Sequence, residues 1–344
     1  MHLLVDIRTS NPTDTLTEDY AVAWVELWKT YHPDDTITYL ANSETSIQKN
    51  VILVPRGWDI FGKKRIANHK NGPDRIISFS TLTPIDPHIP TLTHIFDNAS
   101  LLYPRSELNY FERKKKENAY KKLLRKSHHI VVPHLETGME LVEIFGISEK
   151  KISVIPYFLP KKEYSSFTLL HPYSITPMYW IVEGTRGDEW NPFQLLQAYS
   201  HYIHEHNGTK RLIIVGDLGS NLKYISDCIR GLNIMEYVKI IGTLPKGEKN
   251  ALYENASGWI SLGRYYSGGP NIAYALAYGL PILSSDIAPV RDYADITVHP
   301  NHTDEFLEKL LFLAKLQTGG EKYIHNPHAI MDVYARVLAE STCN

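Results

Sequence analysis

Cysteine is scarce in this chain, and long apolar runs are missing from it. The two cysteines among 344 residues, Cys228 and Cys343, lie far apart and outside any metal-like spacing, so neither a disulfide framework nor a cysteine-based zinc site is expected. No segment approaches the roughly 20 consecutive apolar residues that a membrane-spanning helix needs. A net charge of −2 gives no global reason to expect a nucleic-acid partner. We therefore expect a cytoplasmic, globular protein that binds no nucleic acid.

Short apolar runs, separated by helix-length segments, recur along the whole chain. Such alternation is typical of parallel sheets covered by helices. The first series of expected strands is Leu3–Ile7, Thr36–Leu40, Val51–Val54, Arg75–Phe79, Thr93–Phe96, His129–Val132 and Lys151–Ile155. The second series is Met178–Val182, Arg211–Val215, Val238–Ile241, Gly258–Leu262, Pro281–Ser284 and Ile296–Val298. The predicted fold class is α/β, with two doubly wound, Rossmann-like parallel-sheet domains.

A stretch between the two series marks the expected domain boundary. Tyr157–Pro177 is rich in Pro, Ser, Tyr and Lys and has no sustained period, which suits a connection. We predict an N-terminal domain over 1–160, a linker over 161–177, a C-terminal domain over 178–325, and a terminal segment, 326–344, whose helix returns towards the N-terminal domain. Two such domains would leave a cleft between them, and ligands are expected there at the carboxyl ends of the strands.

A glycine turn between a predicted strand and a predicted helix is the most informative motif. In the segment YSGGPNIAYALAYGLP, which begins at Tyr266, Gly268 and Gly269 allow close backbone approach and Pro270 suits a first helical turn. The free N–H groups of such a turn carry partial positive charge and can hold an anion such as a diphosphate. An ordinary strand-to-helix connection is the alternative. The position after the predicted strand Gly258–Leu262 favours the anion site.

Further motifs follow one another in the second half of the chain. They are Ile213-Ile214-Val215-Gly216-Asp217, Ile241-Gly242-Thr243-Leu244-Pro245, Leu252-Tyr253 with Ala256, Gly268-Gly269-Pro270-Asn271 and Ala277-Tyr278-Gly279-Leu280-Pro281. In this order they resemble the carboxyl-terminal domain of retaining, GT-B-fold glycosyltransferases of family 4. Glu143–Pro156, and Leu101–Pro104 after Asp97, are similar to landmarks of the family's first domain. The remaining amino-terminal part matches only in pattern.

The resemblance implies a transferase that moves a hexosyl unit from a nucleotide-sugar donor to a glycan or lipid-linked acceptor, with retention at the anomeric carbon. The diphosphate would lie at the turn of Gly268 and Gly269, and the base near Thr243 and Leu244. A metal is not expected, because the chain has no Asp-x-Asp pair and helix N-termini with cationic side chains can stabilise the leaving group. No cofactor is expected besides the nucleotide-sugar co-substrate.

Several positions depart from the family pattern. Family members usually carry one glutamate just before the glycine turn and a second one eight positions later, for the sugar and the ribose, whereas this chain has Tyr266 and Tyr274. In the loop after the first strand of the second domain, Thr185 and Trp190 stand at the usual positions of an arginine and a lysine. Arg186, one residue away, is the best remaining cation. Because tyrosine is neutral near pH 7 and makes fewer hydrogen bonds than a carboxylate, the donor contacts must differ.

The candidate site residues follow from these matches. Arg186 and Asp97 are the expected catalytic residues, and His94, near Asp97, is either an ordinary strand histidine or a sugar contact. The expected donor-binding residues are Gly184, Trp190, Asn191, Thr243, Leu244, Tyr266, Gly268, Gly269, Asn271 and Tyr274. Two interpretations stay open: an active but divergent transferase, which we favour, and a catalytically inactive GT-B module that binds a glycan, a nucleotide or a partner enzyme.

A basic segment of the first domain predicts a surface partner. Arg113–Lys126 carries eight Lys and Arg residues against Glu117, and Phe111, Leu123 and Leu124 add apolar contacts. Similar helices in the family's first domain rest on anionic membranes, where each cation contributes about 1 kcal/mol. A solvated basic face is the alternative. The membrane interpretation predicts peripheral attachment to the inner face of the cell membrane.

Overall fold

The computed structural model describes residues 1–8, 15–41, 47, 49–54, 66, 72–80, 82, 86, 88–96, 98, 110–157, 162–185, 190–264, 270–287, 290–319 and 326–340. The chain forms two compact units. The first unit comprises Met1–Leu102, Leu108–Phe158 and His325–Asn344, and the second comprises Tyr103–Glu107 and Leu159–Ile324. Among the described helices, none has both the length and the apolarity that crossing a membrane would require.

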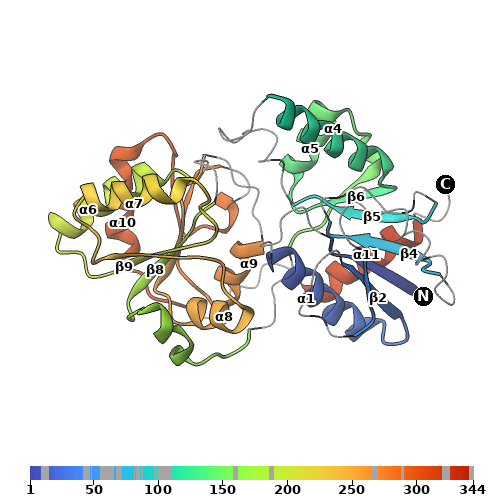
Figure 1. Ribbon diagram of the computed structural model, residues 1–344, viewed down its shortest axis with the longest axis horizontal. Helices are drawn as coiled ribbons and strands as arrows, with labels where there is room; N and C mark the ends of the chain where they lie inside the picture. The colour runs from blue at the N-terminus through green and yellow to red at the C-terminus, as the bar shows by residue number, and fades with distance from the viewer. Residues whose placement is uncertain are drawn as a thin grey trace. The chain divides into compact units, whose positions relative to one another are not determined.

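The first unit is built on a parallel sheet with the strand order β3-β2-β1-β4-β5-β6-β7. The strands are β1 (His2–Asp6), β2 (Thr36–Ala41), β3 (Val51–Leu53), β4 (Arg75–Ser78), β5 (Thr91–His94), β6 (His129–Val132) and β7 (Ile152–Val154). Its described helices are α1 (Thr15–Tyr31), α4 (Tyr110–Lys126), α5 (Leu135–Phe145), the 3-10 turn η1 (Glu149–Lys151) and α11 (Pro327–Glu340). The terminal helix α11 packs beside α1, so both ends of the chain contribute to this unit (Figure 1).

The second unit is built on a parallel sheet with the strand order β10-β9-β8-β11-β12-β13. The strands are β8 (Tyr179–Glu183), β9 (Arg211–Val215), β10 (Val238–Ile241), β11 (Gly258–Ser261), β12 (Ile282–Ser285) and β13 (Ile296–Val298). The helices are η2 (Phe167–Tyr173), α6 (Pro192–His204), α7 (Asn221–Gly231), α8 (Lys246–Glu254), α9 (Pro270–Ala277), η3 (Val290–Tyr293) and α10 (Thr303–Leu313). The helix α6 packs against both α7 and α10 (Figure 1).

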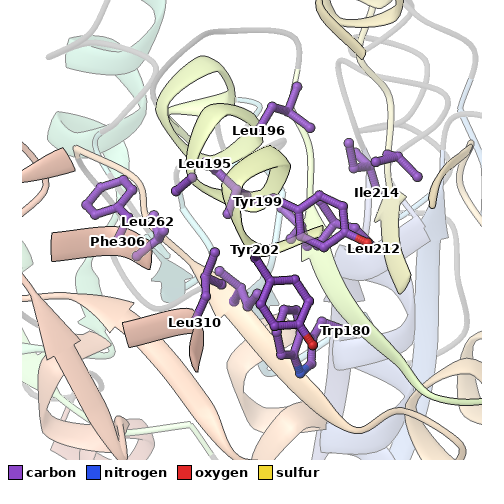
Figure 2. Close-up of a cluster of buried hydrophobic side chains, with 14 of the residues drawn as sticks. Trp180, Leu195, Leu196, Tyr199, Tyr202, Leu212, Ile214, Leu262, Phe306 and Leu310 are labelled. Carbon is purple, nitrogen blue, oxygen red and sulfur yellow. The ribbon is translucent and has the colours of Figure 1, made fainter. Parts of the chain in front are cut away.

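The core of the second unit explains why its central strand is apolar throughout. A strand in the middle of a helix-covered parallel sheet is buried on both faces, so it shows a continuous apolar run instead of an alternation. In β8, the four residues from Tyr179 to Val182 are buried. Figure 2 shows Trp180 beside Tyr202 of α6, with ring centroids 5.0 Å apart. Leu310 of α10 belongs to the same cluster, so α6 and α10 are fixed against the sheet.

The predicted α/β class with two parallel sheets is confirmed, and so are all thirteen strands in their order. One strand is displaced: β5 begins at Thr91 and ends at His94, whereas the sequence predicted Thr93–Phe96. Pairing explains the shift, since Thr91 lies opposite Ile76 of β4 in the sheet register. In the described part of the expected linker, η2 packs against α8 of the second unit.

Candidate functional site

The strand order of the second sheet reverses direction at β8. This strand lies between β9 and β11. The strands β9 and β10 follow on one side of it, and β11, β12 and β13 follow on the other side. In open α/β sheets, ligands bind outside the carboxyl ends of the strands at such a switch point. Glu183 ends β8, and α9 follows β11 in the chain. The region around Glu183 and the start of α9 is therefore the candidate site of this unit.

Seven of the predicted site residues fall within the described residues. They are Gly184, Trp190, Asn191, Thr243, Leu244, Asn271 and Tyr274. The other five, Arg186, Asp97, Tyr266, Gly268 and Gly269, lie outside the described residues. The site is accordingly built from the ends of β8 and β10, from α8 and from α9.

Asn271 and Tyr274 share one face of α9, because residues three apart on a helix are neighbours. Lys249 of α8 covers that face: its Nζ lies 3.8 Å from the centroid of the Tyr274 ring and 3.4 Å from Asn271 Oδ1. The Lys249 side chain is buried, with 8% of its surface exposed. Tyr274 stands where the family pattern has its second glutamate, and the ammonium of Lys249 lies on the face of its ring.

Glu183 is the second charged group of the site. Asn271 donates its Nδ2–H to Glu183 Oε2, and Tyr253 of α8 donates its hydroxyl to Oε1. Burial raises the pKa of the Glu183 carboxyl to about 7, although Lys249 and the hydrogen bonds oppose the shift. Protonated and ionised forms of this carboxyl therefore coexist near neutral pH.

Sequence reasoning missed both Glu183 and Lys249. The two residues lie on different elements, 66 positions apart, and only the fold brings them to Asn271. A signal for Glu183 did exist, because a carboxylate ends a strand that is otherwise apolar throughout. Lys249 gave no such signal, since a lysine within a short polar helix normally faces solvent.

Gly184 follows Glu183 and packs closely on the neighbouring loop. Its N–H donates to Val215 O at 2.9 Å, and a Cβ at Gly184 would lie 2.3 Å from Leu218 Cδ2. Opposite it, Gly216 has a φ of +128°, and a Cβ there would lie 2.2 Å from Gly184 O. Only glycine fits at Gly216, because the clash would be with backbone. The pair brings the loops after β8 and β9 together beside Glu183.

Trp190 and Asn191 are held within the second unit. Trp190 is buried in the hydrophobic cluster that contains Trp180 and Leu195. Asn191 is buried in the left-handed conformation just before α6, and its Nδ2–H donates to Pro300 O at 3.0 Å. These contacts fix the start of α6 against the loop after β13. The donor contact of both residues stays a prediction.

Thr243 and Leu244 follow β10, at the edge of the sheet. Thr243 is exposed, whereas Leu244 is buried. An exposed hydroxyl beside a buried aliphatic side chain suits a flat group with a polar edge, such as a nucleobase. Their role as the base contact stays a prediction.

In the first unit, the structure assigns His94 to the core. The ring is stacked on Phe79 with centroids 4.2 Å apart, and its Nε2 lies 2.8 Å from the Tyr334 hydroxyl. Complete burial lowers the pKa of His94 to about 3. These contacts support the interpretation of His94 as an ordinary strand histidine and not as a sugar contact.

The basic helix α4 divides its residues between the core and the surface. Leu123 and Leu124 are buried in a cluster with Ile130, so they hold the helix on the first sheet. Tyr110 and Phe111, at the start of the helix, are 71% and 81% exposed. The exposed cationic residues are Lys114, Lys115, Lys122, Arg125 and Lys126. The outward face is thus strongly basic and begins with two aromatic rings.

Comparison with known proteins agrees with this geometry. A family model described as "Glycosyl transferases group 1" matches residues 179–324, a range that begins with β8 and contains the candidate site. A search of curated proteins finds no match. The family match therefore concerns the second unit.

Solved structures resemble the whole chain. HepE of Anabaena, in complex with UDP and glucose, superposes with a TM-score of 0.72 at 11% identity, over 99% of this chain and 100% of that one. Sucrose-phosphate synthase of Thermosynechococcus elongatus gives 0.70 at 12% identity, over 99% and 100%. WaaG, a glycosyltransferase involved in lipopolysaccharide biosynthesis, gives 0.68 at 12% identity, over 99% and 95%. The chain therefore has the GT-B fold, which together with the family match supports a GT-B glycosyltransferase.

Proposed function

We propose that this protein is a retaining, metal-independent glycosyltransferase that moves a hexosyl unit from a nucleotide-sugar donor to a glycan or lipid-linked acceptor. The observation that carries the proposal is the coincidence of two findings in the second unit. The match to glycosyl transferases group 1 covers 179–324, and within that range the hydrogen bond from Asn271 to Glu183 joins the start of α9 to the end of β8. A helix start at a switch point is suited to a diphosphate.

The chemistry requires stabilisation of the leaving nucleoside diphosphate. As the bond between the anomeric carbon and the diphosphate breaks, negative charge grows on the departing oxygen, and groups aimed at that oxygen lower the barrier. We assign this role to the N–H groups at the start of α9 and to Arg186. The leaving diphosphate would accept the acceptor's proton on the same face of the sugar, which gives retention without a separate base.

Metal independence, the donor, the acceptor and the family are each supported by a different observation. Metal independence rests on the sequence, which contains no Asp-x-Asp pair. A hexose donor is suggested by HepE, whose structure holds UDP and glucose. A lipid-linked or glycan acceptor is suggested by WaaG, which is involved in lipopolysaccharide biosynthesis. Membership of family 4 rests on the motifs from Ile213 to Pro281.

We further propose that the protein attaches peripherally to an anionic membrane through α4. The supporting observation is the exposure of Tyr110 and Phe111 at the start of a helix whose outward face is basic. Aromatic rings and cations together suit the interface of a bilayer, where rings enter the headgroup region and cations pair with anionic lipids. Attachment would keep the protein at a surface that carries lipid-linked acceptors.

A thermal-shift panel of nucleoside diphosphates and nucleotide-sugars tests the proposed function. A ligand that binds only the folded state, at 100 times its Kd, stabilises it by about 2.7 kcal/mol. We expect one nucleoside diphosphate and its sugar conjugates to raise the melting temperature, without added metal and in the presence of EDTA. If binding occurs but the sugar is never released, the inactive GT-B module becomes the better description. Absence of any shift over the panel would contradict the proposal.

A further inference from the structure

Lys249 is a buried cation that lies directly against the start of α9. Its Nζ contacts Asn271 Oδ1 at 3.4 Å, and Asn271 is the second residue of that helix. The first N–H groups of a helix have no partner within the helix. The ammonium of Lys249 thus contacts a side chain of the first turn of α9, and the N–H groups of that turn carry partial positive charge.

Burying an ammonium is unfavourable unless neighbouring groups compensate its charge. The Asn271 oxygen and the face of Tyr274 are neutral, and they compensate part of it. Glu183 is a charged group that interacts with Lys249, and both contact Asn271: Lys249 Nζ donates to the amide Oδ1, and the amide Nδ2 donates to the carboxylate. Asn271, at the start of α9, therefore links the buried cation of Lys249 to the carboxyl of Glu183.

The groups that surround Glu183 come from three elements. Lys249 and Tyr253 face it from α8, Trp259 from β11 and Asn271 from α9. Among these described neighbours, Lys249 carries the charge that opposes a proton on Glu183, and desolvation favours that proton. A second anion placed beside Lys249 would compete with Glu183 for the same cation.

We propose that Lys249 is the cation that receives the donor's diphosphate at the start of α9, and that the Glu183 carboxyl takes up a proton when the diphosphate arrives. This inference rests on the proposed function, since it concerns the same donor. It assigns a cation to a site where Thr185 and Trp190 stand at the positions of the family's arginine and lysine. In the protein without nucleotide, Glu183 neutralises Lys249; in the complex, the phosphates do.

The coupling has a defined direction. A negatively charged ligand favours the protonated form of Glu183, so the ligand binds most tightly where that carboxyl is already protonated. The pKa of this group is about 7 in the protein without nucleotide. Affinity for the donor is therefore constant well below that pH and falls above it, by a factor that approaches tenfold for each pH unit.

Isothermal titration with UDP-glucose, GDP-mannose and ADP-glucose tests the proposal. The diphosphate of these compounds is esterified at both ends, so it lacks the second phosphate ionisation near about pH 6 that would otherwise add its own pH dependence. The tightest of the three is then titrated into Lys249→Met, Glu183→Gln and Lys246→Met. The last variant is the matched control, since Lys246 is an exposed cation of the same helix that pairs with Glu163.

We expect Lys249→Met to raise the Kd by about 10- to 100-fold, the size of a charge-assisted contact, and Lys246→Met to leave it within about twofold. Glu183→Gln should bind more tightly than the wild type above pH 7 and should lose the pH dependence. Equal affinities of the wild type and Lys249→Met, with the wild type binding well, would overturn the inference and leave the proposed function intact.

If the variants do not fold, proton uptake by the wild type on binding tests the same inference. Titrations near pH 7 in two buffers of different ionisation enthalpy give the number of protons taken up on binding. We expect a net uptake of protons on binding, because the pKa of the carboxyl is about 7 in the protein without nucleotide and rises when the diphosphate binds. Zero uptake would overturn the inference. No binding of any nucleotide-sugar would contradict the proposed function, and the inference with it.

Discussion

His94 and Tyr334 are joined by a hydrogen bond of 2.8 Å, although 240 positions separate them in the chain. The other ring nitrogen of His94, Nδ1, lies 3.3 Å from the carbonyl oxygen of Ser78. A carbonyl only accepts, so Nδ1 carries the proton and Nε2 accepts from the Tyr334 hydroxyl. The bond connects α11 to β5, an interior strand of the first sheet.

Replacing Tyr334 by phenylalanine should destabilise the first unit. The change leaves Nε2 of His94 buried without its donor, and a buried unsatisfied acceptor costs about 1–3 kcal/mol. We expect a loss of that size in the free energy of unfolding, measured with urea near neutral pH. Tyr224→Phe is the control, because that side chain is 66% exposed. Equal unfolding midpoints for both variants would show that the hydrogen bond contributes nothing.

The buried His94 should also make the protein sensitive to acid. Its folded-state pKa of about 3 lies below the unfolded value of 6.5, so the unfolded chain binds more protons between these two values. Stability is therefore lost as the pH falls below about 6.5, by up to about 1.4 kcal/mol for each pH unit. His94→Phe should reduce this slope of the unfolding free energy against pH by one proton. His206→Gln, at an exposed position, should not; an unchanged slope in His94→Phe contradicts the assignment.

The close contact between Gly184 and Gly216 should be needed for the position of the loops around Glu183. Gly216→Ala places a methyl group 2.2 Å from Gly184 O on a residue with a φ of +128°, so the loop after β9 must move. We expect a loss of stability of about 2 kcal/mol or more and weaker nucleotide binding. Gly231→Ala is the matched control, because its Cβ would meet no atom within 4 Å. If both alanine variants bind the nucleotide equally well, the close approach of the two loops is not needed.

The basic helix α4 can be tested on lipid vesicles. Lys115, Lys122 and Lys126 are exposed, and changing all three to glutamine removes about 1 kcal/mol of attraction for each cation near an anionic surface. In a sedimentation assay, we expect the partition coefficient for vesicles that contain phosphatidylglycerol to fall by about two orders of magnitude. Changing Lys223 and Lys239 of the second unit to glutamine is the control. Equal partitioning of the wild type into neutral and anionic vesicles would contradict membrane attachment.

The fold could be predicted from the sequence because its central strands, such as β8 and β12, are buried on both faces. The continuous apolar run from Tyr179 to Val182 predicts a buried strand. The motif Gly268-Gly269-Pro270 predicts the start of a helix in the sequence after β11. The contacts of the candidate site could not be predicted in the same way. Lys249 and Glu183 both contact Asn271, and the sequence alone does not show that a lysine of a short helix faces inward. The core position of Trp190 was likewise not visible in the sequence, and its predicted donor contact stays a prediction.

The proposed function requires the second unit to bind a nucleotide-sugar and to break the bond between its sugar and its diphosphate. The most direct measurement is release of nucleoside diphosphate from UDP-glucose, GDP-mannose and ADP-glucose, followed by ³¹P NMR in the presence of EDTA with the wild type and Arg186→Ala. We expect release from at least one donor by the wild type, and a loss of about ten- to a hundredfold or more in Arg186→Ala. Absence of release from every donor, or equal release by both proteins, would contradict the proposal.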